Sequence, residues 1–519
     1  MLDLIKDYVR INNLSLAESQ SSVYEFDCII PDVMPDMLKI LAVDTYTETS
    51  SVDKTSDGAN ILFKINYKIL YLSDSDKQIK AFSAVSEHSA KIKFPAISED
   101  DTLHVLCRVE KTDSVYINSR KISVKTTVRT EALQKSCTET GICNGISGAD
   151  DIQIQKDSVT ISNLAESISK QFEIDEEIEL SSGKAAYKEI LRSDAMLSDI
   201  SHNIIGDKMQ IKGNLQICTL FIADDISDTL QIIENEIPFT HSIEIENISE
   251  NISHHTDFLL NKYSVEALPP DLDGENRILH VTATVIANID AYSICEQEIL
   301  KDAYSLSQSF TLGTSSVKAM LISEDISGQF VLRDSASKTD DLPEIAQIVN
   351  VTAFPGEYSC SASDGKVAVA GNIICNVLYL AEDADAPIAS FVSLVPFVQN
   401  FDCPQVSDGM QVLASICVNH ISFNIMSPSE TELRISVAIK GTAIKQIKFD
   451  TISEITQPDS PYLEELSDRP AILLYVVQQG DSLWKIAKRY NAPLELLKEV
   501  NQLKNPDLLY PGQKLLIPR

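Results

Sequence analysis

The chain has 519 residues, 44% of them hydrophobic, and carries a formal net charge of −33. This length predicts about three to five domains rather than a single core. The acidic balance excludes nucleic acid as a partner, because phosphate contacts need a basic face, and it disfavours adhesion to anionic membranes. The sequence has no run of about 18 apolar residues, so no membrane span is expected.

The N-terminal stretch "MLDLIKDYVRINNL" places Leu2, Ile5 and Val9 at helical spacing, which predicts a short amphipathic helix. It lacks the basic and then apolar segments of a secretory signal peptide. The ten cysteines are scattered along the chain and form no CxxC pair. These features favour the reducing cytosol, where several cysteines would serve as small buried hydrophobic residues.

Three stretches alternate apolar and polar residues, which is the pattern of a β-strand with one buried face. They read "NILFKINYKILYL", "KMQIKGNLQICTLFI" and "KVAVAGNIICNVLYL", and each follows a turn signal. The aromatic residues near their ends, Tyr71, Phe221 and Tyr379, are 150 and 158 residues apart. Because this spacing is the size of a domain, it indicates one unit repeated three times.

The expected fold class is mainly β, with three tandem β-rich, sandwich-like domains followed by a small module. Asp450–Pro470 is acidic, contains three prolines and lacks periodicity, so it is interpreted as a linker. The expected division is a first β domain with the N-terminal helix over 1–135, a polar connector over 136–160, a second domain over 161–312, a third over 313–449, the linker over 450–470 and the module over 471–519.

Residues 475–519 differ in composition from the acidic body, with five Lys and two Arg against two Asp and two Glu. Tyr475–Val477 fits a short strand, and Asp481 is a good N-cap for a following helix. Pro493 suits the first turn of a second helix, and Lys514–Ile517 suits a closing strand. The order predicts a basic β-α-α-β module.

The stretches "YVVQQGDSLWKIAKRY" and "NPDLLYPGQKLLIP" resemble the LysM family over the full length of this module. One departure is Ala492-Pro493, where the family commonly has a threonine cap. The family typically binds N-acetylglucosamine-containing glycans in a shallow groove between two loops. The resemblance implies a ligand or partner groove formed by Gly480, Asp481, Ser482, Leu483, Asn505, Pro506, Leu508, Tyr510 and Pro511. Leu483, Trp484 and Tyr490 can also be interpreted as core residues.

The stretch "IPDVMPDMLKILAVD", Ile30–Asp44, resembles a signature of SPOCS domains, which occur in spore coat proteins. The other two repeats have "SSGKAAYKEIL" and "KTDDLPEIAQI" instead. With the LysM module, the chain resembles the SipL/SpoVID-type family of spore coat morphogenetic proteins. The resemblance implies a mother-cell cytoplasmic protein at the forespore surface. Its partners would be other coat proteins and the ATPase of the coat's basement layer, contacted through LysM.

A basic face formed by Lys485, Lys488 and Arg489 would suit an acidic protein partner. The alternative is a peptidoglycan-binding protein whose LysM groove holds N-acetylglucosamine. A wall hydrolase is a third reading with little support, because no acid/base pair or nucleophile constellation stands out.

Other titratable residues have structural interpretations. The sequence lacks GxGxxG, GxxxxGK[ST], GxSxG and HExxH motifs. The expectation is a non-enzymatic protein without a cofactor or metal. We expect turn or cap roles for Asp32 and Asp36. We also expect His254-His255 to lie in a polar segment, and Cys137 and Cys143 to lie in a loop.

Overall fold

A computed structural model describes residues 2–12, 16–94, 97–99, 101–181, 183–226, 228–245, 252–269, 275–383, 385–457, 472–503, 505 and 508–518. Most of the described residues lie in long antiparallel strands, as the alternating stretches predict. The predicted N-terminal helix is wrong, because Asp3–Asn12 forms strand β1. β1 pairs along its length with β8, Cys137–Ser147, and this pairing outweighs the local helical spacing.

The body is built from three units of the same design, each with two sheets of three strands, and in unit 2 one of these sheets is extended by β1 and β8 into a five-stranded sheet. One sheet of each unit, here called the ribbon sheet, pairs the first strand of the unit with its last. The fifth strand of the unit also belongs to the ribbon sheet, and the other sheet, here called the axial sheet, holds the second, third and fourth strands. Unit 1 contains β2 (Leu16–Ile29), β3 (Met37–Thr55), β4 (Gly58–Ser73), β5 (Ile79–Lys93), β6 (Thr102–Asn118) and β7 (Lys121–Lys135).

The second and third units repeat this strand order. Unit 2 contains β9 (Ile152–Glu179), β10 (Tyr187–Ile205), β11 (Lys208–Ala223), β12 (Leu230–Glu244), β13 (Ser253–Ala267) and β14 (Ile278–Ser305). Unit 3 contains β15 (Thr311–Ser337), β16 (Gln347–Ser363), β17 (Lys366–Leu380), β18 (Ile388–Asp402), β19 (Gln411–Ser427) and β20 (Glu430–Thr456).

Each unit has its own apolar core between its two sheets. The apolar faces of the three alternating stretches point into these cores, and Tyr71, Phe221 and Tyr379 are fully buried. The Tyr71 hydroxyl donates to the Pro35 carbonyl at 3.0 Å. The Tyr379 hydroxyl makes the equivalent bond to Pro343 at 2.8 Å. The unit that the sequence repeats three times is therefore a β-sandwich. The predicted fold class, mainly β with three tandem sandwich-like domains, is confirmed.

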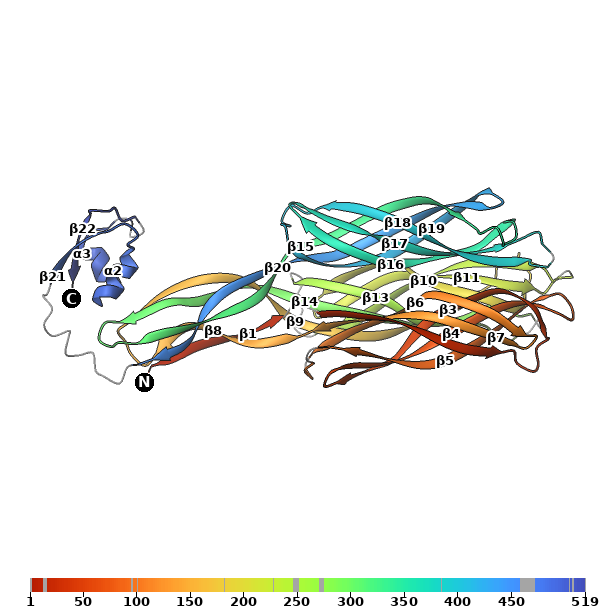
Figure 1. Cartoon of the computed structure of the whole chain (residues 1–519), viewed down its shortest axis with the longest axis horizontal. Helices are drawn as coiled ribbons and strands as arrows, with labels where there is room; N and C mark the ends of the chain where they lie inside the picture. The colour runs from red at the N-terminus through yellow and green to blue at the C-terminus, as the bar shows by residue number, and fades with distance from the viewer. Residues whose placement is uncertain are drawn as a thin grey trace.

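The three axial sheets meet in one shared apolar layer. Equivalent strands contribute to it, because Leu70, Leu220 and Leu378 occupy the same position of β4, β11 and β17. Their burial removes apolar surface that each isolated unit would expose to water. The units are thus arranged about a common axis as a pseudo-trimer within one chain, visible as the stacked sheets of the body (Figure 1).

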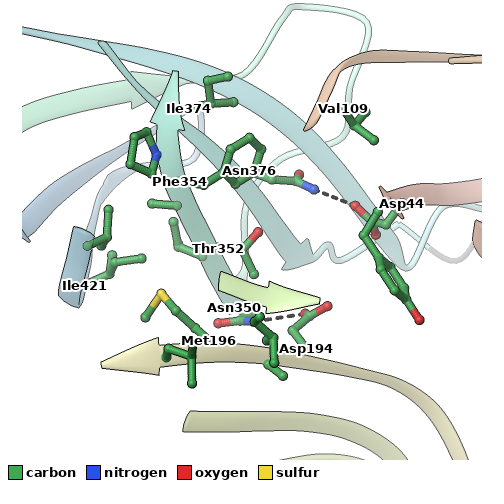
Figure 2. A pocket seen from close by; sticks show the side chains of 18 of the residues that line it. Asp44, Val109, Asp194, Met196, Asn350, Thr352, Phe354, Ile374, Asn376 and Ile421 are labelled. Carbon is green, nitrogen blue, oxygen red and sulfur yellow. Dashed lines mark hydrogen bonds between the residues drawn. The ribbon is translucent and has the colours of Figure 1, made fainter. Parts of the chain in front are cut away.

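A buried polar layer lies next to the apolar layer, and Arg192 of unit 2 is its centre. Its guanidinium forms ion pairs with Asp44 of unit 1 and with Asp194 of its own unit. Unit 3 completes the layer through Asn350, which donates to Asp194 at 3.0 Å, and Asn376, which donates to Asp44 at 2.5 Å (Figure 2). Hydrogen bonds and charges thereby connect all three units at the axis.

The ionisation of this layer follows from its burial and its pairing. Burial raises the pKa of Asp44 above its ordinary value. Burial also acts on Asp194, but there the adjacent guanidinium of Arg192 outweighs it and lowers the pKa. Lys68, which donates to the Tyr263 hydroxyl at 2.9 Å, has its pKa lowered by burial to about 8.

A stalk of three two-stranded ribbons projects from the body (Figure 1). β14 pairs with β9 and β20 with β15 over their full lengths, so these strands run without a break from the body into the stalk. The third ribbon is β1 with β8. Apolar residues from the ribbons pack together inside the stalk, among them Val9, Ile142, Ile161, Ile299 and Ala319.

The polar connector expected over 136–160 is also wrong, since this segment forms β8 and the beginning of β9. Its polar residues face solvent, while Ile142 and Cys143 are buried in the stalk. The linker expected over 450–470 begins within β20, which ends at Thr456, and residues 458–471 lie outside the described part of the chain.

We predict that Arg192→Met destabilises the body by about 3–5 kcal/mol, because Asp44 and Asp194 would be left as neighbouring buried carboxylates. Urea unfolding of the full chain measures this loss. The triple variant Arg192→Met/Asp44→Asn/Asp194→Asn removes the uncompensated charges and should recover most of the stability. Wild-type stability of the single variant would show that the layer does not hold the units together.

A second prediction concerns pH. Lys135 and Asp290 form a buried ion pair where units 1 and 2 join the stalk. Burial lowers the pKa of His104 and of His255, beside this pair, from 6.5 to about 4. The unfolded chain therefore binds more protons between these values. Stability should fall as the pH drops below about 6.5, by up to about 1.4 kcal/mol per pH unit for each histidine.

Thermal unfolding measured between about pH 7 and about pH 5 tests this, because most carboxylates stay charged in that range. The variant His104→Gln/His255→Gln should lose part of the slope, whereas His420→Gln, at an exposed position of β19, should keep it. An unchanged slope in the double variant would contradict the assignment.

Candidate functional site

The C-terminal module has the predicted β-α-α-β order. It comprises β21 (Ile472–Val476), α2 (Leu483–Tyr490), α3 (Leu494–Val500) and β22 (Lys514–Pro518). β21 and β22 pair in antiparallel register. The N-cap of α2 is Ser482 rather than the predicted Asp481, and its hydroxyl accepts from the Lys485 N–H at 3.2 Å. The Asp481 carboxylate instead closes the preceding turn, accepting from the Gln478 N–H at 2.9 Å.

The module has a small apolar core between its helices and its two strands. Leu483, which the groove prediction included, is only 4% exposed and belongs to this core. Asn501 ties α3 to β22, because its amide donates to the Leu516 carbonyl at 2.7 Å and accepts from the Leu516 N–H at 2.7 Å. These contacts fix the framework on which the two loops of the predicted groove are held.

The two loops are joined at their bases and exposed at their tips. The Gly512 N–H donates to the Val477 carbonyl at 2.8 Å, and the Val477 N–H donates to Gln513 at 2.9 Å. Gly480 turns the first loop with a φ of +88°, a value that favours glycine. Exposed groove residues on the two loops are Gly480, Ser482, Asn505, Leu508, Tyr510 and Pro511, while Pro506 lies outside the described residues.

Two of these side chains are large and apolar, with Leu508 56% and Tyr510 65% exposed. The Tyr510 backbone is held in place by a bond from its N–H to Gln513 at 3.1 Å. An aromatic ring beside exposed loop backbone can stack on a sugar or pack against a protein side chain. The loops therefore offer an apolar wall and polar backbone groups in one place.

Helix α2 and the residues that follow it contact the tip of the stalk. The Trp484 indole N–H donates to Asp302 of β14 at 2.8 Å, and Lys488 forms an ion pair with the same carboxylate at 2.5 Å. The Tyr304 ring packs edge-on against Trp484 with centroids 5.1 Å apart. Its hydroxyl donates to the Ala492 carbonyl at 2.7 Å. Trp484 is thus half-buried at an interface with the stalk, which sequence reasoning did not foresee.

The three residues of the predicted basic face have different surroundings. Lys488 is paired with the stalk. Lys485 is exposed, and its ammonium donates to the Gly480 carbonyl at 3.3 Å. Arg489 donates to the Tyr475 hydroxyl at 3.1 Å. Lys485 lies beside the groove loops, whereas Lys488 faces Asp302.

The body contains a cavity of about 1680 Å³ lined by all three units, part of which Figure 2 shows. Its walls combine the buried polar layer with apolar side chains such as Val109, Met196, Phe354 and Ile374. The charged groups of the polar layer bind one another and the amides of unit 3, so this wall of the cavity connects the three units.

Asp32 and Asp36 lie in the turn between β2 and β3, as predicted. Arg120 holds this turn, pairing with Asp36 at 2.8 Å and donating to the Ile30 and Met34 carbonyls at 3.1 Å. In unit 2, Arg277 donates to backbone carbonyls of the equivalent turn, although the "PDVMPD" sequence is missing there. These aspartates therefore have a structural role.

The remaining candidates are dispersed. His254 is within hydrogen-bonding distance of His202, 3.0 Å between Nε2 atoms. Cys137 and Cys143 lie on strand β8 rather than in a loop, and burial raises the pKa of both thiols. Among the described residues, no group of three or more His, Cys, Asp or Glu side chains could hold a metal ion. No helix in the same part of the chain is long and apolar enough to cross a membrane.

Comparison with protein families identifies both kinds of domain. A LysM domain model matches residues 475–518. A model described as "SipL, SPOCS domain" matches residues 187–268 and 344–426. These two regions run from β10 to β13 and from β16 to β19. The first region lies in unit 2 and the second in unit 3. The "PDVMPD" motif lies in unit 1, which has the same strand order.

Curated relatives match over short stretches. "Spore coat assembly protein ExsA" of Bacillus cereus is 52% identical over 46 residues, 9% of this chain and 7% of the relative. "SpoIVD-associated factor A" of Bacillus subtilis is 52% identical over 46 residues, 9% of this chain and 12% of the relative. "Probable autolysin SsaALP" of Staphylococcus aureus is 44% identical over 50 residues, 10% and 18% of the two chains. Each match thus spans a small part of the relative.

No solved structure matches the chain. The matched domains, the repeated units and the C-terminal module agree with one another. The chain is therefore a protein of tandem SPOCS-type domains with a C-terminal LysM domain.

Proposed function

We propose that the chain is a non-enzymatic scaffold of spore coat morphogenesis. In this proposal its LysM domain docks onto the ATPase of the coat's basement layer at the forespore surface, on the mother-cell side. A relative named for spore coat assembly and the combination of SPOCS and LysM domains support the assignment to the coat. The choice of the ATPase rests on the family resemblance.

The observation that carries the proposal is the orientation of the LysM domain. Its Trp484 and Lys488 are engaged with Asp302 at the stalk tip, while Leu508 and Tyr510 on the groove loops stay exposed. A domain held by one side and open on another is suited to recognising a partner. The stalk separates this recognition site from the body, which leaves the SPOCS-type units accessible to other coat proteins.

Charge favours a protein as the partner. Lys485 is exposed beside the loop of Gly480, so an acidic surface docking there would gain complementary charge. A LysM domain in the mother-cell cytosol is also separated by a membrane from wall glycan. The competing candidate is peptidoglycan, favoured by the exposed Tyr510 and by the resemblance to a probable autolysin.

Substitution of the groove wall tests the docking site. Leu508→Ala/Tyr510→Ala should raise the dissociation constant for the purified ATPase by about tenfold or more, because it removes two exposed apolar contacts. Ile472→Ala/Leu474→Ala is the matched control, since these residues of β21 are 59% and 57% exposed but lie outside the groove loops. Binding of the full-length variants is measured by surface plasmon resonance.

Equal losses in both double variants would argue against the groove. Sedimentation of the wild-type chain with purified peptidoglycan, together with no measurable ATPase binding, would replace the protein-docking proposal with the glycan alternative. The groove variant would then be compared with its control on peptidoglycan.

The stalk contact gives a separate prediction, because Trp484 is the only tryptophan in the chain. Asp302→Ala removes the acceptor of its indole N–H and the partner of Lys488, which should weaken docking of the domain by about 1–2 kcal/mol. The expected result is a red shift of the fluorescence emission as Trp484 becomes hydrated. The control is Glu298→Ala, which lies on the same strand as Asp302, β14, and removes an ion pair with Lys156 of β9; it should leave the emission unchanged. Unchanged emission in Asp302→Ala would contradict the contact.

A further inference from the structure

Strand β18 of unit 3 carries an exposed apolar strip. It is an edge strand of its axial sheet. Val392, Leu394 and Val398 project from one face of it with 63%, 60% and 73% exposure. They alternate along the strand, so with Pro396 between them they form a continuous row on one face. Folding of unit 3 does not bury this row, although its other face supplies Phe391, Val395 and Phe397 to the core.

The pseudo-symmetry of the body provides an internal comparison. The positions of Val392 and Leu394 are occupied in unit 2 by Glu234 and Glu236, as the pairing of the equivalent strands shows. In unit 1, Val85 takes the position of Leu394, and Ser83 and Ser89 take those of Val392 and Val398. The same fold therefore tolerates polar residues at these sites, and the apolar row is a property of unit 3 that folding does not require.

The charge pattern shows what kind of partner fits. From Ile388 to Phe401 strand β18 has no charged residue, and neither does its neighbour β17 from Val367 to Leu380. The equivalent edge strands β5 and β12 carry charged residues within them, which is the usual protection of an edge against association. In a chain of net charge −33, two copies repel each other over most of their surface. A face free of charge is where that repulsion is weakest.

We propose that this face of β18 is a self-association surface that joins two copies of the chain. The row is self-complementary under a two-fold axis through Val395, which would bring Val392 of each copy against Val398 of the other and Leu394 against Pro396. Such an interface is isologous and closes as a dimer. Proline in a strand interrupts the backbone donors of its edge, so Pro396 favours packing of the two faces over extension of the sheet.

Sedimentation velocity of the full-length protein under reducing conditions, over a range of concentrations, tests the proposal. The wild type should convert from monomer to dimer as its concentration rises. Val392→Glu/Leu394→Glu introduces the residues that unit 2 has at these positions, and should raise the dimer dissociation constant by about tenfold or more. Because the equivalent strand of unit 2 folds with these glutamates, the variant should keep the wild-type thermal midpoint.

Val85→Glu is the matched control, since it places the same charge at the equivalent position of unit 1. It should dimerise as the wild type does. A wild type that stays monomeric at every concentration would overturn the proposal and leave the row to a different protein. A dimer that survives Val392→Glu/Leu394→Glu, or that Val85→Glu weakens equally, would also overturn it.

Discussion

The architecture depends on one buried guanidinium. Arg192 stands at the axis of the body between Asp44 of unit 1 and Asp194 of unit 2, and unit 3 supplies the amides that complete the hydrogen bonds. The apolar layer beside it would pack comparably in any order of three similar sandwiches. The polar layer would not, because unit 1 has Ala42 and unit 3 has Asn350 where unit 2 has the arginine. Leaving a buried charge without its partner costs several kcal/mol, so the polar layer favours the observed order of the units over the others.

The arrangement of the three units about the axis also determines the arrangement of the stalk, because four strands continue from the body into the stalk. β9, β14, β15 and β20 belong to a sandwich at one end and to the stalk at the other, so the placement of the units also places the ribbons. The stalk in turn ends at Asp302 and Tyr304, which receive the LysM domain. A series of contacts thus runs from the axis of the body to the LysM domain. The net acidic body and the basic module therefore meet through specific hydrogen bonds and an ion pair.

Sequence alone predicted what short-range patterns encode. Period-2 alternation predicted the central strand of each axial sheet, and the motifs of the C-terminal stretch predicted the LysM domain. The N-terminal helix was predicted wrongly because Leu2, Ile5 and Val9 fit a helical spacing, whereas the pairing of β1 with β8 is a contact between residues more than 120 positions apart. Arg192 and Asp302 were missed for the same reason. Arg192 contacts Asp44 of another unit, 148 residues away, and Asp302 contacts Trp484, 182 residues away, so neither long-range contact is marked by a local pattern.

Repetition also changes how the surface can be interpreted. In a single sandwich, no equivalent position shows whether an exposed valine or glutamate is required for folding. Three copies of one framework supply that comparison, because a residue that folding demands should recur at all three equivalent positions. The aromatic core residue does so as Tyr71, Phe221 and Tyr379. The outer row of the edge strand does not, being largely polar in unit 1, acidic in unit 2 and apolar in unit 3. Since the fold accommodates all three, these differences reflect what each unit meets outside itself.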